Sequence, residues 1–311
     1  MSNFQNLREK IAARADKFAE IRDFFRERGV LEVDTQVLRE FAVTDPNLCS
    51  LEVSARGKSV GFLATSPEYA MKILLAGGSG AIYQFAHIFR GEEEGRRHLR
   101  EFSLVEWYRP DFSLDELMAE VADLLQILLR QKLSVKKTSY GELFRAAFGV
   151  DIFSAEISKI AAIATKIVPE SAAWNLDRDA YLDLLFTHEI EPHLGKNCLE
   201  FIVEYLPSQA ALAKLSSDKN GNLTAARFEA YIAGVELCNA FDELASSSEQ
   251  RARFLADNRK RAELNLPVMK IDEEFLYALD NLPSCAGVAL GLDRVLMLAW
   301  GMNNIREVIY I

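Results

Sequence analysis

The stretch that decides the fold is FRGEEEGRRHLREFSLVEWY, which runs from Phe89 to Tyr108. Apolar segments at 81–89 and 102–108 are typical of two strands. The loop between them carries four Arg, one His and four carboxylates. So many charges cannot be buried without partners, but they can lie over a ligand with several negative charges. A solvated hairpin loop is the alternative, and this stretch alone does not decide between the two.

Two side chains of this loop have the chemistry of a nucleotide contact. Arg90 ends the first strand and Glu92 follows two residues later, so both can point to the same face. The planar donor fork of an arginine can hold a phosphate, and a carboxylate can accept from an amino group.

Composition indicates a globular protein without a membrane segment. Half of the 311 residues are hydrophobic and 26% are charged, and the net charge of −10 argues against general nucleic-acid binding by a basic surface. The N-terminus is polar, and no apolar run approaches the ~18 residues that cross a bilayer. Four scattered cysteines indicate free thiols rather than zinc ligands or disulfides. We therefore expect a cytoplasmic protein.

Periodicity places further elements around the central strands. Apolar residues at three- and four-residue steps predict a helix from Leu7 to Phe25, either at a subunit interface or in the core. Ser66-Pro67-Glu68 is typical of a helix start. The remaining predicted elements are a hairpin at 51–63, helices at 114–133, 248–264, 272–280 and 295–300, a helical insertion at about 134–195, and strands at 30–33, 201–203, 227–233, 234–237 (after a kink at Gly234) and 286–290.

Two segments resemble metal-binding motifs but lack a feature that each motif requires. His188 and His193 lie five residues apart, whereas a zinc-binding helix needs four. The acidic segment that begins at Asp218 has Leu223 where a calcium loop needs Gly, and Asn220-Gly221 is better explained as a hairpin turn.

Two other constellations have the same character as the arginine-rich loop. The glycine-rich segment from Gly287 leads into a helix with Arg294 in its first turn, which suits a phosphate, although a plain strand-to-helix corner is the alternative. Glu236 and Glu243 are seven residues apart and suggest a magnesium or an ammonium site, or else two unrelated surface acids.

In this order the three elements resemble the catalytic core of class II aminoacyl-tRNA synthetases, above all the lysyl type. Residues 18–38 resemble the first family motif (with Gln36 in place of the usual proline), residues 89–106 the second, 287–294 the third, and 234–244 the lysyl signature. The resemblance covers nearly the whole chain. It implies an α+β fold with a mixed, mostly antiparallel sheet flanked by helices.

The chain is too short for a full lysyl-tRNA synthetase and is similar to the elongation factor P (R)-beta-lysine ligase family. ATSPEY at 64–69, VEWYRP at 105–110 and CAGVALG at 285–291 carry this similarity, and Ala289 replaces a glycine that is usual in lysyl-tRNA synthetases. We therefore expect residues 1–311 to form a single catalytic domain, with the insertion at about 134–195 and no anticodon-binding domain.

The resemblance implies an ATP-dependent, AMP-forming ligase. It would activate (R)-beta-lysine, or lysine, as an aminoacyl-adenylate and transfer it to a lysine of elongation factor P. It implies ATP and Mg²⁺, a homodimer, and no tRNA or membrane binding. The alternatives are a ligase of small-molecule amino acids and a non-catalytic regulatory paralogue.

Site residues follow by position from the resemblance. Arg90 would hold the α-phosphate, Arg294 the terminal phosphate and Glu92 the adenine amino group; both arginines are the catalytic candidates. The full ATP set is Arg90, Gly91, Glu92, Leu99, Glu236, Leu237, Gly291 and Arg294. The amino-acid set is Ser66, Pro67, Glu68, Tyr108, Asn239 and Glu243, and the magnesium ligands are Glu236 and Glu243.

One departure bears on the nucleotide site. Relatives carry His-Asn-Pro-Glu-Phe where this chain has HLREF at 98–102. Leu99 cannot make the side-chain hydrogen bond of that Asn, a loss of roughly 0.5–1.5 kcal/mol. Leu99 is the observation that motivates the non-catalytic alternative.

Overall fold

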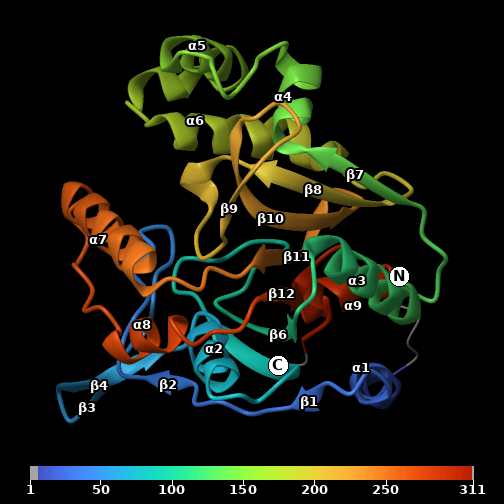
Figure 1. Ribbon diagram of the computed structural model, residues 1–311. Helices are drawn as coiled ribbons and strands as arrows, with labels where there is room; N and C mark the ends of the chain where they lie inside the picture. The colour runs from blue at the N-terminus through green and yellow to red at the C-terminus, as the bar shows by residue number, and fades with distance from the viewer. Residues whose placement is uncertain (1–5, 310–311) are drawn as a thin grey trace. The chain divides into compact units, whose positions relative to one another are not determined.

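A computed structural model describes residues 6–309, and the chain divides into two compact units. One unit joins the chain up to Gln131 with the chain from Glu243 onward, and the other spans Lys132–Asp242. Each is built on strands with helices against them (Figure 1).

The first unit contains the strand pair that the sequence singles out. Its strands lie in the order β1-β5-β6-β12, and a separate small sheet has the order β2-β4-β3. The strands are β1 (Leu31–Glu32), β2 (Leu38–Arg39), β3 (Glu52–Ala55), β4 (Lys58–Leu63), β5 (Ile82–Phe89), β6 (Glu101–Pro110) and β12 (Cys285–Gly291). β1 pairs with β5 in parallel, whereas β5 with β6 and β6 with β12 are antiparallel.

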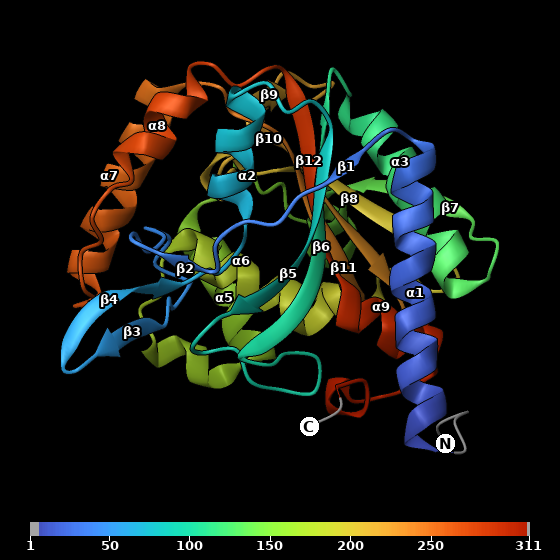
Figure 2. The ribbon, with the colours of Figure 1, turned by 90° about the horizontal axis from the view of Figure 1, so that it is seen from below.

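Helices cover both faces of this larger sheet. Figure 2 shows α1, α3 and α9 on one side of β5, β6 and β12, and α2, α7 and α8 on the other. These helices are α1 (Leu7–Glu27), α2 (Glu68–Ala76), α3 (Leu114–Leu129), α7 (Ser247–Glu263), α8 (Glu273–Leu279) and α9 (Leu292–Ala299). A single turn of 3-10 helix follows at Ile305–Glu307.

The core on the α1 side is aromatic. The ring of Phe25 stacks on Tyr83 with centroids 4.3 Å apart and meets Trp107 edge-on at 5.3 Å. The indole nitrogen of Trp107 donates to Glu120 of α3 at 3.0 Å. Because side chains alternate along a strand, this packing of Trp107 sends its neighbours on β6 to the opposite face.

The second unit contains the remaining strands of the larger sheet, with helices packed on them. Its strands are β7 (Val135–Ser139), β8 (Leu199–Tyr205), β9 (Leu215–Ser217), β10 (Leu223–Ile232) and β11 (Val235–Asp242). They follow the order β11-β10-β8-β7, with β9 also on β10, and only the β7–β8 pair among them is parallel. Its helices are α4 (Tyr140–Phe148), α5 (Ile157–Ile167) and α6 (Arg178–Leu185), with short turns of 3-10 or π helix at Pro169–Ala173, Phe186–Ile190, Glu191–His193 and Pro207–Gln209.

These pairings confirm the predicted α+β fold with a mixed, mostly antiparallel sheet flanked by helices. The four cysteines are free thiols, as expected. The carboxylate of Asp218 accepts from the backbone N–H groups of Asn220 and Asn222, both at 2.8 Å, which confirms a turn there. No described helix is both long and apolar enough to cross a bilayer.

Three local predictions differ from the structure. The segment predicted to be helical from residue 134 begins with β7, a strand whose sequence VKKTS carries little pattern and which forms by pairing with β8. Gly234 was expected to kink a continuing strand, but the chain reverses there, with φ of +52° at Ala233 and +71° at Gly234. Helix α3 ends at Leu129 rather than Leu133, because Arg130 adopts a left-handed conformation.

One buried carboxylate ties three elements of the first unit together. Asp293 accepts from Arg14 of α1 at 2.7 Å and from the backbone N–H of Ser103 in β6 at 2.6 Å. Arg14 also donates to the Ser103 hydroxyl at 2.9 Å.

Replacing Asp293 with Ala should therefore destabilise the fold. The change leaves a guanidinium and a backbone N–H without their acceptor, and we expect a loss of about 3 kcal/mol in the free energy of unfolding. Urea denaturation measures it. The control Asp23→Ala removes an exposed ion pair with Arg26 and should barely move the midpoint. Equal midpoint shifts in both variants would contradict this role of Asp293.

Candidate active site

Strand β6 presents two polar side chains on the face opposite Trp107. Glu106 and Tyr108 are each only 2% exposed, and the Tyr108 hydroxyl donates to Glu106 at 2.6 Å. The other oxygen of Glu106 accepts from the Ser66 hydroxyl at 3.0 Å. A buried carboxylate thus sits between two hydroxyl groups.

Ser66 connects this carboxylate to helix α2. Its hydroxyl accepts from the backbone N–H of Glu68 at 2.9 Å, and the helix begins at Glu68 with Pro67 as its cap. The sequence predicted a helix start at Ser66-Pro67-Glu68, and Ser66 makes a turn just before the helix, from which its hydroxyl donates to Glu106.

A lysine, Lys72, lies between the carboxylates of Glu68 and Glu243. Lys72 is 1% exposed, and its ammonium is 2.6 Å from Glu68 and 2.5 Å from Glu243. Glu68 and Lys72 are four residues apart and therefore share one face of α2. The backbone N–H of Glu243 donates to the carbonyl of Cys285 at 3.0 Å, which fixes Glu243 beside β12.

These contacts define one group of side chains, which we call the carboxylate cluster: Ser66, Glu68, Lys72, Glu106, Tyr108 and Glu243. Ser66, Glu68, Tyr108 and Glu243 were predicted from the sequence, and the structure brings these four together. Lys72 was missed, and Glu106 was noted only as part of a motif. The available signals were a single cation in the apolar helix EYAMKILLA and the alternation of Glu106 with Tyr108 in an apolar strand.

Burial controls the protonation of the cluster. It raises the pKa of Glu106 to about 8, and the negative charge of Glu68 adds to the effect. Burial also raises the pKa of Glu243, against the attraction of Lys72. Because the ammonium contacts Glu243 directly while Glu106 has only hydroxyl partners, we assign the proton of this pair to Glu106.

Lys72 stays charged. Burial alone would lower its pKa, but the carboxylates of Glu243 and Glu68 outweigh that effect and raise the pKa above its ordinary value. With Glu106 neutral, the cluster has two carboxylates and one ammonium, and ionisation of Glu106 adds a second surplus negative charge. Such a charge balance suits a ligand with ammonium groups.

Glycine at position 287 makes room for the cluster. A Cβ there would lie 2.3 Å from Glu243 Oε1 and 2.4 Å from the ring of Tyr108. From the sequence, this glycine-rich segment was expected to suit a phosphate. At Gly287 the space is filled by two cluster side chains.

The arginine-rich loop is anchored on both sides. The side chain of Arg90 donates to the Thr65 carbonyl at 3.3 Å and pairs with Glu93 at 2.9 Å, and it lies over the ring of Phe102. Gly91 donates to the Cys49 carbonyl at 2.8 Å, and a Cβ there would meet the Cys49 sulfur at the same distance. Glu92 is exposed and Leu99 is half-buried.

Helix α9 returns to this same loop. Gly291 caps the helix, and Arg294 in its first turn donates to the carbonyl of Arg97 at 3.2 Å. The structure therefore brings the second predicted arginine to the loop that carries the first. Each arginine has a protein partner, and each is partly exposed.

The other predicted residues lie on β11 of the second unit. The side chain of Leu237 is buried, whereas Glu236 and Asn239 are half-buried. The side-chain oxygen of Asn239 accepts from Arg227 at 2.9 Å, which orients its amide group. Among residues 6–309, no group of three or more His, Cys, Asp and Glu side chains is arranged to hold a metal ion. The magnesium roles of Glu236 and Glu243 stay predictions.

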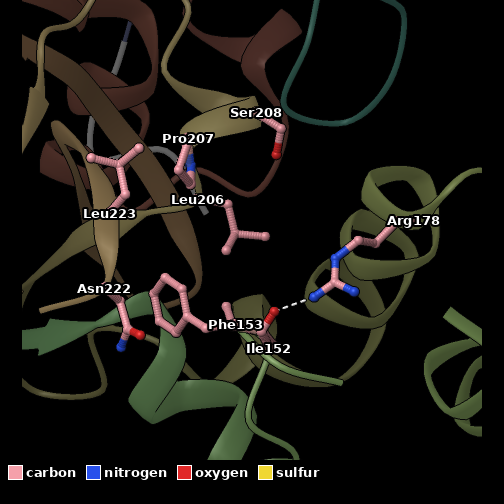
Figure 3. A pocket seen from close by; sticks show the side chains of 8 residues that line it. All are labelled: Ile152, Phe153, Arg178, Leu206, Pro207, Ser208, Asn222 and Leu223. Carbon is pink, nitrogen blue, oxygen red and sulfur yellow. Dashed lines mark hydrogen bonds between the residues drawn. The ribbon is translucent and has the colours of Figure 1, made fainter. Parts of the chain in front are cut away.

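A separate hollow of about 450 Å³ lies within the second unit (Figure 3). Its one cation, Arg178, donates to the carbonyls of Ile152 and Ala155, so it holds the chain rather than a ligand. None of the predicted site residues lines this hollow, whose walls are Ile152, Phe153, Arg178, Leu206, Pro207, Ser208, Asn222 and Leu223.

The fit at position 287 gives a direct test of the cluster's packing. Gly287→Ala should lower the free energy of unfolding by about 1–3 kcal/mol, since Tyr108 is held in β6 and cannot move away. Thermal or urea denaturation measures it. Gly95→Ala, where an added Cβ meets nothing within 4 Å, is the matched control. Equal stability of the two variants would mean that Gly287 is not packed as described.

Comparison with known proteins shows the family of this chain. The family described as tRNA synthetases class II (D, K and N) matches residues 2–311. Proteins named elongation factor P--(R)-beta-lysine ligase are similar along nearly their whole length. The one from Photorhabdus laumondii is 47% identical over 95% of this chain and 92% of its own, and the one from Avibacterium paragallinarum is 44% identical over 97% and 94%. The one from Proteus mirabilis is 47% identical over 93% and 90%. The chain therefore belongs to the class II tRNA synthetase family, among the proteins named elongation factor P--(R)-beta-lysine ligase.

Proposed function

We propose that this protein is an ATP-dependent ligase that activates (R)-beta-lysine and attaches it to a lysine side chain of elongation factor P. The names of its relatives support this function over a ligase of small-molecule amino acids. The observation that carries the proposal is the carboxylate cluster, a buried site with more negative than positive groups and hydroxyls beside them.

The cluster would recognise the terminal ammonium of the amino acid. Glu243 and Glu106 offer charge, and the hydroxyls of Tyr108 and Ser66 can accept from the ligand through a remaining lone pair while they donate to Glu106. A bound ammonium also stabilises ionised Glu106, so its proton leaves as the ligand arrives. Pro67 and Asn239 complete the proposed amino-acid set.

The arginine-rich loop and α9 would hold ATP. Arg90 would contact the α-phosphate and Arg294 the terminal phosphate, each exchanging a backbone carbonyl partner for a charged oxygen. Glu92, on the exposed side of the loop, would accept from the adenine amino group. Gly91, Leu99, Leu237 and Gly291 would line the nucleotide.

Two displacements complete the proposed reaction. A carboxylate oxygen of the amino acid attacks the α-phosphorus of ATP, and the bond from that phosphorus to the pyrophosphate oxygen breaks. The amine nitrogen of the acceptor lysine then attacks the acyl carbon, the bond from that carbon to the bridging anhydride oxygen breaks so that AMP leaves with this oxygen, and the nitrogen loses a proton. Positioning and charge neutralisation by the arginines supply most of the acceleration.

Magnesium, when bound with the nucleotide, would neutralise phosphate charge. The half-buried carboxylate of Glu236 has the oxygen chemistry that Mg²⁺ prefers. Glu243 fits a metal less well, since the Lys72 ammonium already lies 2.5 Å from it. We therefore propose Glu236 as a ligand.

The wider setting is also a proposal. We propose that residues 1–311 act as one catalytic domain with the insertion at about 134–195, that the protein is a homodimer, and that it does not use tRNA. Because the acceptor named in the relatives is a translation factor, the cytoplasm is the proposed compartment.

Pyrophosphate exchange tests the proposed activity and its arginines. ATP–pyrophosphate exchange should be faster with (R)-beta-lysine than with lysine, and Arg90→Ala and Arg294→Ala should each abolish it because they remove phosphate contacts. Arg26→Ala, at an exposed ion pair on α1, is the control and should keep full exchange. Faster exchange with lysine would contradict the proposed substrate. Near-normal exchange in Arg90→Ala or Arg294→Ala would contradict the proposed phosphate contact of that arginine.

The pKa of Glu106 predicts a pH dependence. Since burial raises that pKa to about 8, kcat/KM for the amino acid should rise roughly tenfold per pH unit up to pH 8 as the carboxyl ionises. Lys72 and the substrate ammonium remain charged over this range. Glu106→Gln should abolish this rise of kcat/KM with pH and lower kcat/KM at pH 8.5 by about 30-fold or more. If kcat/KM of Glu106→Gln still rose with pH in the same way, the titrating group would be another residue.

A further inference from the structure

Lys72 is an anomaly in the fold. It is the one cation in helix α2, whose other residues after Glu68 are apolar, and its side chain is fully buried. Burying a lysine costs several kcal/mol unless charged partners compensate. Its partners are Glu68 and Glu243, both members of the carboxylate cluster.

The ammonium fixes how Glu243 presents its two oxygens. Oε2 lies 2.5 Å from Lys72, while Oε1 points to the space above Gly287, where a Cβ would meet it at 2.3 Å. One oxygen is thus held by the protein, and the other faces the side where Tyr108 also lies. Lys72 holds one oxygen of Glu68 in the same way, at 2.6 Å.

We propose that Lys72 is a positioning residue for amine recognition, which rests on the proposed function. Its ammonium aims the carboxylates of Glu68 and Glu243 and holds them side by side. It does not contact the reacting atoms. Without this cation the three acids would repel one another and turn apart, and the carboxylate cluster would lose its ordered acceptors.

An opposite role makes a distinct prediction. If Lys72 merely competed with the substrate ammonium, its removal would add net negative charge and tighten amino-acid binding. A positioning role predicts weaker binding. The direction of the change in KM therefore separates the two.

The test is pyrophosphate exchange with (R)-beta-lysine in Lys72→Met. We expect KM for the amino acid to rise about 100-fold, while KM for ATP stays within about threefold, because the nucleotide contacts are elsewhere. Lys17→Met is the matched control, since Lys17 is 6% exposed and pairs with Glu20 on α1. An amino-acid KM that is unchanged or lower in Lys72→Met would overturn the proposal.

Rescue by a small amine gives a second readout. Lys72→Ala removes three methylenes and the ammonium, so propylammonium matches the missing atoms. Adding it should raise kcat/KM of this variant by at least about tenfold. The neutral 1-propanol should not. Failure of propylammonium to rescue a folded variant, or unfolding of both variants with and without it, would make Lys72 structural. Wild-type protein without any exchange would instead overturn the proposed function.

Discussion

The ammonium of Lys72 lies 2.6 Å from Glu68 and 2.5 Å from Glu243 in a place that water does not reach. Like charges held this close would repel, so the lysine is what holds two carboxylates together beside a third. This constraint brings three parts of the chain together: helix α2, strand β6 and Glu243, which directly follows β11 in the sequence. The surplus negative charge that remains is the basis for amine recognition.

The register of β6 determines which of its side chains reach the carboxylate cluster. β6 sends Trp107 to the aromatic core on one side and Glu106 with Tyr108 to the cluster on the other. A one-residue slip would exchange the two faces. The link from Asp293 to Arg14 and Ser103 holds β6 and α9 together, and α9 also carries Arg294 to the arginine-rich loop. The amine and phosphate groups of the proposed reaction are thus served by one rigid strand and its neighbours.

The sequence predicted what local pattern encodes. The strands β5, β6 and β12 were recognisable from apolar runs, and the motifs predicted Arg90 and Arg294, which the structure brings to one loop. Lys72 stands out as a single cation in an apolar helix, but its pairing could not be predicted, because its second partner, Glu243, is distant along the chain and only the fold brings them together. Strand β7 was missed for the same reason, since pairing with β8 makes it a strand. The turn at Ala233–Gly234 shows how a glycine can signal reversal as readily as a kink.

The central claim is that buried carboxylates recognise the terminal ammonium of the substrate. It is tested most directly by comparing pyrophosphate exchange with (R)-beta-lysine and with 3-aminoheptanoic acid, which carries a methyl group in place of that ammonium. A site that pairs the charge should reject the analogue by at least about a thousandfold in kcat/KM, because its carboxylates would stay buried and unpaired. Values within about tenfold of each other would contradict the account.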